Sequence, residues 1–195
     1  MPDKPGAKRT TAQRQDALVW IDCEMTGLNP DTEGIIEIFC LITDGQLNLL
    51  DPCGWGTVVH QTKERMDMMD EWCTRTHGDS GLTSAVISST VTPSQAADGL
   101  LAYIQQHIPE KRVALLAGNS VHADRAFLRK EPYRQVLDYL HYRILDVSSI
   151  KEAARRHYRG GPSQKRAAQG ERRHILESIE EARFYKTAIF QAAKS

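Results

Sequence analysis

The sequence lacks the features that most quickly place a protein in a functional class. Its 195 residues include 25 basic and 25 acidic side chains, so the formal net charge is zero. A protein that grips long nucleic acid through bulk charge is usually basic, so any contact with nucleic acid is expected to be local. The four cysteines form no CxxC pair and no zinc-ligand spacing. This pattern favours reduced thiols over a disulfide framework or a zinc site.

Long apolar runs and signal-peptide cores are also missing. We therefore expect no membrane segment and an intracellular protein, either cytoplasmic or mitochondrial. Residues 1–16 are polar and contain proline and glycine, a composition typical of a flexible tail. The basic residues in this tail leave a mitochondrial presequence open, although Asp3 and two prolines weaken that reading. Residues 17–195 have a length that suits one compact domain.

The first half of this domain reads as strands followed by a helix. "ALVWIDCEM" and "GIIEIFCLITD" are rich in β-branched residues, and "QLNLLD" and "GTVVHQ" extend the pattern into a predicted meander. The period then changes over "KERMDMMDEWCTRTHG", which predicts one helix. Met66, Met69, Trp72 and Cys73 lie at helical spacing there, with Gly78 as a stop.

From residue 92 onward, helices and strands alternate. Thr92, Pro93 and Gln95 predict a helix that starts with a capping box, and Ser149 with Glu152 predicts a second one. A meander followed by such alternation predicts an α/β fold with a mixed central sheet flanked by helices. The remaining segments are a strand at "RVALLAGNS", a helix broken near Pro132, a strand at "YRILDVSS", a loop over residues 159–173 and a last helix over residues 174–191.

Two acids stand out at the end of the first strand. Asp22 and Glu24 are one residue apart, and residues i and i+2 of a strand point to the same face. Unpaired charge at the end of a buried strand is costly. Either this strand end is hydrated, or the two carboxylates hold a divalent cation, which hard oxygen ligands suit. Gly27 follows in a turn that lets the backbone approach a ligand closely.

Two further residues are candidates for the same site. Asp124, in "AGNSVHADRAFL", is a third carboxylate, although an acid in the first turn of a helix has an ordinary explanation. His174 opens the last predicted helix, where a solvated surface histidine is equally ordinary. Taken singly, neither residue requires a function.

Five blocks of sequence, taken together, resemble the oligoribonuclease family, a branch of the DEDD exonucleases with a catalytic histidine. In order they are "WIDCEMTGL", "DEWCTRTHGDSGLT", "AGNSVHADRAFL", "LHYRILDVS" and "ESIEEARFY". The resemblance covers residues 17–191. It implies an RNase H-like fold and 3′-to-5′ hydrolysis of very short RNAs to 5′-mononucleotides. It also implies two Mg²⁺ or Mn²⁺ ions on Asp22, Glu24 and Asp124, with His174 as the catalytic histidine.

The resemblance also implies roles in substrate binding. Leu28 matches a wedge between two bases, and Trp72 matches an aromatic that packs against a base, although its spacing equally predicts core packing. The family binds the end of the small RNA through a set of residues that includes an arginine, because the planar guanidinium group can bind a phosphate with two hydrogen bonds. In this chain they are Ser120, His141, Tyr142 and Arg143, with Tyr142 contributed across a homodimer interface.

The last motif departs from the family pattern. That pattern is HxAxxD, then an isoleucine and a segment like "ESI". Here His174 runs directly into "ILESIEE", and Ile179 stands where the acid is expected. About five residues, with the fourth acidic ligand, are thus missing before Ile175, and activity is expected to be impaired. Glu177 is an alternative acid one turn further on.

Two other readings of the chain are weighed against an active enzyme for short RNA. The first is a catalytically inactive homologue that binds nucleotides or pairs with an intact subunit. The second is a proofreading DNA exonuclease, which "HYRILDVS" and "WCTRTHG" disfavour because they resemble the small-RNA branch.

Overall fold

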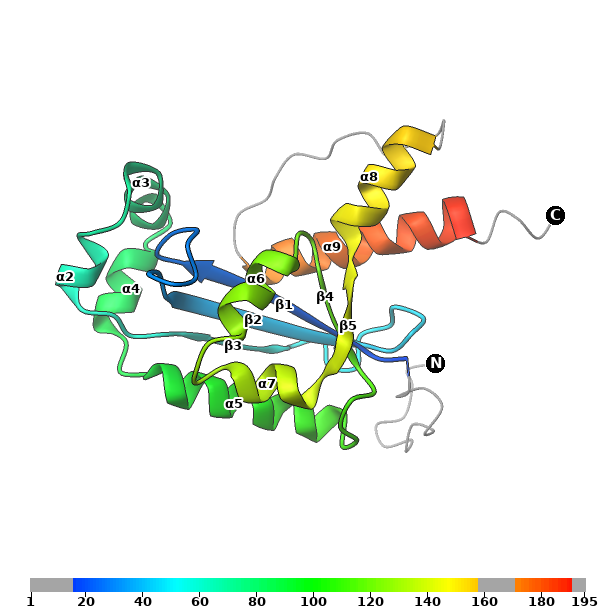
Figure 1. Cartoon of the computed structure of the whole chain (residues 1–195), viewed down its shortest axis with the longest axis horizontal. Helices are drawn as coiled ribbons and strands as arrows, with labels where there is room; N and C mark the ends of the chain where they lie inside the picture. Colours follow the sequence, from blue (N-terminus) through cyan, green and yellow to red (C-terminus); the bar gives the residue numbers. More distant parts are fainter. Residues whose placement is uncertain (1–15, 158–170, 191–195) are drawn as a thin grey trace, which may run out of the picture.

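A central five-stranded sheet is flanked by helices on both faces (Figure 1). The structure is a computed structural model that describes residues 16–157 and 171–190, so the expected tail and most of the expected loop at 159–173 lie outside the described residues. The strands are β1 (Leu18–Met25), β2 (Ile35–Thr43), β3 (Trp55–Val58), β4 (Leu115–Gly118) and β5 (His141–Asp146). The helices are α2 (Lys63–Met66), α3 (Glu71–Asp79), α4 (Leu82–Ser88), α5 (Pro93–His107), α6 (His122–Leu128), α7 (Arg134–Tyr139), α8 (Val147–His157) and α9 (Glu171–Tyr185), with a π-helical turn at Lys186–Phe190.

The sheet is mixed, as the sequence pattern predicts. Its strand order is β3-β2-β1-β4-β5. The β1–β2 and β2–β3 pairs are antiparallel, whereas β1–β4 and β4–β5 are parallel. Because β1, β4 and β5 run in the same direction, their carboxyl ends meet at one edge of the sheet. Residues that follow these three strands are therefore neighbours in space.

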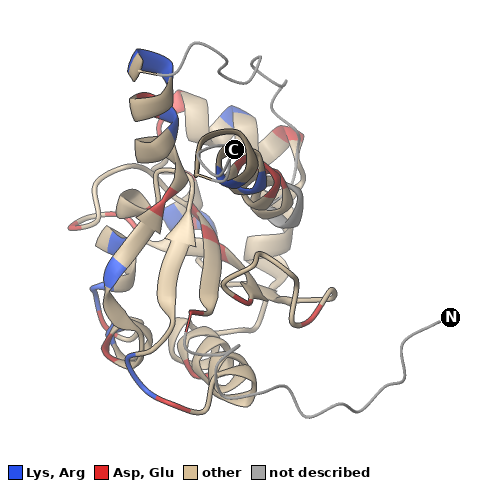
Figure 2. Cartoon of the chain, turned by 90° about the vertical axis from the view of Figure 1, so that its right-hand side faces the viewer, with Lys and Arg blue, Asp and Glu red and all other residues tan. Residues whose placement is uncertain are grey.

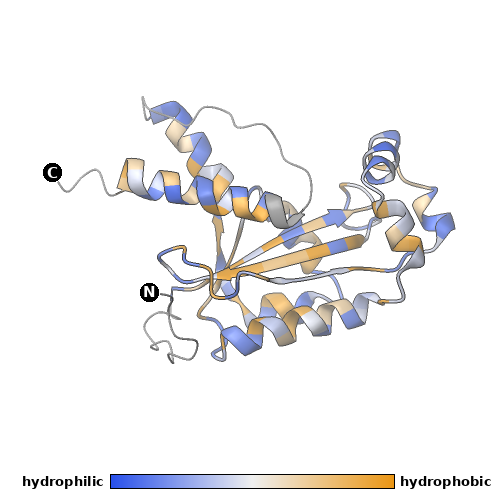
Figure 3. Cartoon of the chain, turned by 180° about the vertical axis from the view of Figure 1, so that it is seen from behind, coloured by the Kyte–Doolittle hydropathy of each residue, from blue (hydrophilic) through white to orange (hydrophobic). Residues whose placement is uncertain are grey.

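Strand β1 is central and buried on both faces, and its side chains alternate between two cores. Ile21 and Cys23 pack with α5, α6 and α7, while Trp20 packs with α8 and α9. Asp22 and Glu24 continue the face of Trp20, as the spacing predicts. Figure 3 shows the apolar strands between these helices. The two acids therefore lie on the side of the sheet that α9 covers.

Helix α9 packs on the sheet through an apolar stripe. Ile175, Ile179 and Ala182 are buried against Trp20 and Leu41 in the core on this face. Their spacing of four and three residues places them on one side of the helix. The stripe fixes the rotation of α9 about its axis, and so it fixes the direction in which His174, just before Ile175, projects.

Two expected elements in the first half are wrong. The segment "QLNLLD" makes only an isolated bridge between Leu49 and Thr43, because Asp44 closes a turn in which its side chain accepts hydrogen bonds from the N–H groups of Gln46 and Asn48. The single helix expected over residues 63–78 is two helices, α2 and α3. Asp70 caps the second by accepting a hydrogen bond from the N–H of Cys73 at 2.7 Å.

The helix starts in the second half are partly as expected. Thr92 and Gln95 form the capping box of α5, with both reciprocal hydrogen bonds present. The box expected at Ser149 is wrong, because α8 begins at Val147 and the carboxylate of Asp146 accepts a hydrogen bond from the N–H of Ser148. The break near Pro132 is present, since α6 ends at Leu128 and α7 starts at Arg134.

The charged residues do not form one basic track. Figure 2 shows acidic and basic residues interspersed along the chain, with a basic end on α8, which carries Arg155 and Arg156. Both arginines pair with Glu152. Among the described residues, no helix has the length and apolar character needed to cross a membrane.

Candidate active site

Asp124 is joined directly to the strand that carries the first two acids. Strand β4 pairs with β1 only as far as Trp20, so the N–H of Cys23 lies beyond the ladder. A buried N–H needs an acceptor, and Asp124 provides it through Oδ1 at 3.0 Å. The carboxylate of Asp124 is thereby held beside β1, at the residue that separates Asp22 from Glu24.

The charges of Asp22 and Glu24 both act on Asp124. Asp124 lies in the first turn of α6 and is only 6% exposed. Burial is the main cause that raises the pKa of Asp124 to about 7, and the charges of Asp22 and Glu24 add to it against the opposing hydrogen bond from Cys23. Burial also raises the pKa of the Cys23 thiol, again with contributions from all three acids. Burial and the neighbouring carboxylates thus both oppose ionisation of Asp124 and Cys23.

His174 reaches the same place from the opposite end of the chain. Its Nδ1 lies 3.4 Å from Oδ2 of Asp22, with the two side chains 39% and 29% exposed. That Oδ2 atom is buried and accepts no hydrogen bond from the part of the chain that the structure describes. The structure therefore brings Asp22, Glu24, Asp124 and His174 together at the carboxyl edge of β1.

Two residues that the sequence analysis did not single out hold the start of α9. Asn119 Nδ2, just after β4, donates to Ser178 Oγ at 2.8 Å, and Ser178 Oγ donates to the carbonyl of His174 at 2.9 Å. The only sequence signal for Asn119 is its place directly after a predicted buried strand. This chain of hydrogen bonds ties the turn that carries His174 to the edge of the sheet.

The donor set fits a divalent cation in kind. Carboxylate oxygens are the ligands of Mg²⁺ and Mn²⁺, and a cation would satisfy the buried Oδ2 of Asp22 and neutralise the charge around Asp124. As they stand, the side chains of the described residues gather no group of three or more His, Cys, Asp and Glu close enough to hold an ion. Binding would therefore require the carboxylates to draw together, which their mutual repulsion opposes until a cation arrives.

The two residues expected to contact bases are exposed. Leu28, in the loop between β1 and β2, is 89% exposed, and Trp72, on α3, is 59% exposed. The core-packing alternative for Trp72 is therefore wrong, although Met66, Met69 and Cys73 of the same pattern are buried. Large apolar side chains exposed at this level are available for contact with a ligand.

Ser120 follows β4 at the carboxyl edge of the sheet. It has a positive φ of 51° and its N–H donates to Asp146 Oδ1 and to Ser148 Oγ. Asp146 also pairs with His122 at 3.1 Å. Ser120 is thus held in a polar cluster at the ends of β4 and β5.

The other residues expected to bind the RNA end lie further away within the chain. His141 pairs with Leu115, which pairs with Leu18, four residues before Asp22 on β1. That separation is about 13 Å along the strand direction, before the lateral spacing of two strands is added. Tyr142 and Arg143 follow in a bulge, where the ring of Tyr142 stacks on His141 and lies beneath Arg143. One chain therefore does not bring Tyr142 to its own acids.

The mixed sheet and the carboxylates at its edge define the class, an RNase H-like exonuclease. Residues 19–171 match the Exonuclease family (RNase_T). The fold is similar to a product-bound exonuclease I, with a TM-score of 0.65 at 12% identity over 89% of this chain and 44% of that one. A second structure, E. coli exonuclease I in complex with a 5cy-dT13 oligonucleotide, matches with a TM-score of 0.61 and 13% identity, over 91% of this chain and 41% of that one.

The chain belongs to the oligoribonuclease family. It is 45% identical to the mitochondrial oligoribonuclease of Mus musculus, over 95% of this chain and 77% of that protein. The identity to the oligoribonuclease of Rhodococcus jostii is 44%, over 90% and 89% of the two chains. It is 49% identical to the mitochondrial oligoribonuclease of Saccharomyces cerevisiae, over 86% of this chain, and spans 65% of that relative's length.

We expect the metal-free protein to lose stability as the pH rises from about 4 to about 7. The pKa of Asp124 is raised from 3.8 to about 7 in the folded chain, so the folded state binds this proton more tightly than the unfolded state. The free energy of unfolding then falls between these two pKa values and levels off above them, by on the order of 4 kcal/mol. Thermal melts in a chelator across this range measure the slope. Asp124→Asn is the control, and a slope unchanged in that variant would assign the effect to other groups.

Proposed function

We propose that the protein is a 3′-to-5′ exoribonuclease that hydrolyses very short oligoribonucleotides, such as dinucleotides, to 5′-mononucleotides. The observation that carries this proposal is the convergence of Asp22, Glu24 and Asp124 at one edge of the sheet, with His174 against Asp22. The relatives named oligoribonuclease support the substrate class. A net charge of zero agrees with a short substrate rather than a long one. Of the two intracellular locations expected, cytoplasmic and mitochondrial, the second agrees with the names of two relatives.

The residues divide the work of hydrolysis between them. Asp22, Glu24 and Asp124 would hold two Mg²⁺ or Mn²⁺ ions, which supply an activated water and stabilise the leaving oxygen when bound. His174 is the group placed to take the proton of the attacking water, since a general base must lie within hydrogen-bond reach of it. Its contact with Asp22 orients the ring.

Substrate recognition falls to residues on other elements. Leu28 and Trp72 offer apolar surface to two neighbouring bases, because stacking and wedging need exposed rather than core side chains. Ser120, which is held at the carboxyl ends of β4 and β5, would contact the phosphate end of the substrate. This arrangement separates binding of the bases from the chemistry at the carboxylates.

Hydrolysis of a labelled RNA dinucleotide tests the proposal. With Mn²⁺ or Mg²⁺ we expect 5′-mononucleotides on thin-layer separation, and no product when a chelator is present. Binding of the dinucleotide without any hydrolysis would support the inactive homologue instead, which neither the fold nor the relatives favour. A protein that neither binds nor hydrolyses the dinucleotide would overturn the proposed function.

The protein is also proposed to act as a homodimer in which Tyr142 serves the partner's site. Tyr142 is 67% exposed and lies in the bulge at the start of β5, too far along the sheet to reach Asp22 of its own chain. A second copy related by a two-fold axis would place it against the opposite site. A monomer by light scattering at micromolar concentration would remove this role.

Mixing two inactive variants tests the exchange between subunits. Tyr142→Ala and Asp22→Ala should each be nearly inactive alone, because each destroys both sites of its own dimer. In a mixed dimer, one site combines the intact Asp22 of one subunit with the intact Tyr142 of the other. Random mixing should therefore restore roughly a quarter of the wild-type activity. No recovery after dissociation and reassociation would place Tyr142 within its own subunit's site or outside any site.

A further inference from the structure

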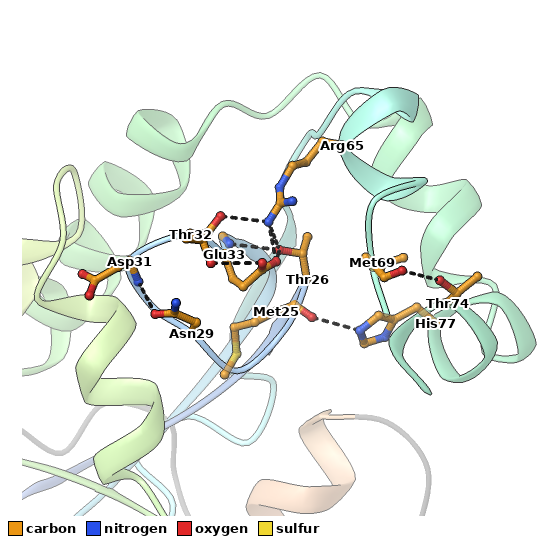
Figure 4. A network of polar contacts seen from close by, with 11 residues as sticks. Met25, Thr26, Asn29, Asp31, Thr32, Glu33, Arg65, Met69, Thr74 and His77 are labelled. Atoms are coloured by element: carbon orange, nitrogen blue, oxygen red, sulfur yellow. Dashed lines mark hydrogen bonds and ion pairs between the residues drawn. The ribbon is translucent and has the colours of Figure 1, made fainter. Parts of the chain in front are cut away.

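A polar network fixes the loop between β1 and β2 to helix α2 (Figure 4). Arg65 Nη2, from α2, donates to Thr26 Oγ1 at 2.8 Å and to the carbonyl of Thr32 at 3.0 Å, and forms an ion pair with Glu33. Thr26 Oγ1 in turn donates to Glu33 Oε2 at 2.5 Å and accepts from the N–H of Gly34 at 3.1 Å. One arginine nitrogen therefore joins both ends of the loop.

This network is too enclosed to be an ordinary surface ion pair. Thr26 is 1% exposed, and the side chains of Arg65 and Glu33 are 22% and 20% exposed. Burial alone would raise the pKa of Glu33, but the hydrogen bond from Thr26 and the charge of Arg65 outweigh it and hold the pKa below its ordinary value. A Cβ added at Gly27 would lie 3.0 Å from Cγ of Glu33, so the carboxylate also has little space to move.

A second contact binds the same loop to helix α3. His77 Nε2 donates to the carbonyl of Met25 at 3.0 Å, and His77 is 2% exposed. Helix α3 also carries Trp72, one and a half turns before His77. Arg65 thus ties both ends of the loop that presents Leu28 to α2. His77 ties the last residue of β1, where this loop begins, to α3, the helix that carries Trp72.

We propose that Arg65 is a positioning residue of the substrate site. It holds the loop that presents Leu28 in a fixed place relative to the helix that presents Trp72, so that the two exposed side chains are spaced for two neighbouring bases. Without this anchor, Leu28 has no packing of its own to hold it, because it is 89% exposed. The substrate would then have to order the loop at the cost of binding free energy. This role rests on the proposed function for its ligand.

The experiment compares Arg65→Gln with Lys63→Gln. Both changes remove one positive charge from α2, but Lys63 pairs with Asp67 on the exposed surface of the helix. For Arg65→Gln we expect the dissociation constant and KM for an RNA dinucleotide to rise roughly ten- to a hundredfold, with kcat changed by less than about threefold, since lost uniform binding raises KM alone. Lys63→Gln should match the wild type in all three. The dissociation constant is read from quenching of Trp72 fluorescence, with Trp72→Phe as the blank.

Two more variants separate positioning from general damage. Arg65→Lys keeps the charge and up to three donors, so it should recover most of the affinity. Gly27→Ala changes no charge but places a methyl group 3.0 Å from Cγ of Glu33. It should therefore raise the dissociation constant for the dinucleotide, as Arg65→Gln does. Melting curves check that each variant is folded, and the loss of Arg65 should lower Tm by about 2–4 °C.

The outcomes distinguish this role from the proposed function itself. Suppose that the wild type binds and hydrolyses the dinucleotide, but Arg65→Gln has the same dissociation constant and KM as Lys63→Gln. Arg65 is then not a positioning residue, while the proposed function stands. A fall in kcat at unchanged KM would also overturn the role. If the wild type neither binds nor hydrolyses, the proposed function fails first, and this role fails with it.

Discussion

Inserting five residues between His174 and Ile175, with an aspartate directly before Ile175, is expected to raise the rate of dinucleotide hydrolysis about 10²–10⁴-fold. The inserted segment restores the HxAxxD pattern of the family that the chain resembles. It returns a fourth acid to the site and gives the histidine back its spacing from the helix. Both changes act on the step in which water attacks the phosphate, so their effects need not add.

The structure gives the reason why position relative to Ile175 decides the chemistry. The stripe of Ile175, Ile179 and Ala182 fixes α9 on the sheet, so the residue directly before Ile175 is the one that meets Asp22. In this chain that residue is His174, at 3.4 Å. In the HxAxxD pattern it is the acid. The shortening thus places the imidazole of His174 where the pattern has a carboxylate, so the base acts from a displaced position and the fourth acid is absent.

Single substitutions separate the two defects. His174→Asp supplies the acid without the base, so it should strengthen Mg²⁺ binding, measured by calorimetry, and leave hydrolysis slow. The five-residue insertion carrying asparagine in place of the aspartate supplies the base position without the acid and should recover less than the full insertion. If the natural chain already cleaves as fast as the repaired one, the shortening is harmless. Glu177→Gln would then show whether Glu177 has taken over.

Replacing Asp22 by alanine is expected to remove the residual activity, by on the order of 10³-fold or more, together with the stabilisation that a divalent cation confers. Asp22 contacts His174 and contributes to the raised pKa of Asp124, so it lies between the base and the other acids. In the wild type, Mn²⁺ at about a hundred times its dissociation constant should add roughly 2.7 kcal/mol to the free energy of unfolding. The variant should gain almost nothing.

Melting curves with and without Mn²⁺ measure this difference. Asp79→Ala, an exposed acid on α3, is the matched control and should keep the wild-type shift. The metal-free Asp22→Ala protein should melt no lower than the metal-free wild type, because removing this charge relieves repulsion with Asp124. An unchanged Mn²⁺ shift in Asp22→Ala would show that the cation binds elsewhere.

Local sequence signals predicted the elements whose cause is local. The apolar run that leads into Asp22 and Glu24 predicts β1, and the spacing of the two acids predicts their shared face. Thr92 with Gln95 predicts the start of α5. The helical spacing over residues 63–78 predicts one helix, because the buried residues Met66, Met69 and Cys73 keep this spacing even though α2 ends at Met66 and α3 begins at Glu71. Thr62 and Asp70 cap two separate helices there, and the period alone does not reveal the second cap.

The site depends on contacts between residues far apart in the chain, which such signals do not carry. Cys23 and Asp124 are 101 positions apart, and Glu33 and Arg65 are 32 apart. The sequence predicts that Asp124 joins Asp22 and Glu24, but it does not predict the hydrogen bond from Cys23 that holds Asp124 there. The second pair has no motif at all, because an arginine and a glutamate in separate polar segments are unremarkable until the sheet and α2 place them together.

The position of the apolar stripe on α9 also bears on the fate of this chain in a cell. Ile175, Ile179 and Ala182 all come after the shortened segment. The apolar packing of α9 on the sheet through these residues therefore does not depend on which residues precede Ile175. Chaperones and proteases act on unfolded chains and exposed apolar surface, and the three stripe residues stay buried despite the shortening. A polypeptide with a damaged catalytic edge would therefore accumulate to normal abundance. Its defect would be visible only as a build-up of undigested short RNA, not as missing protein.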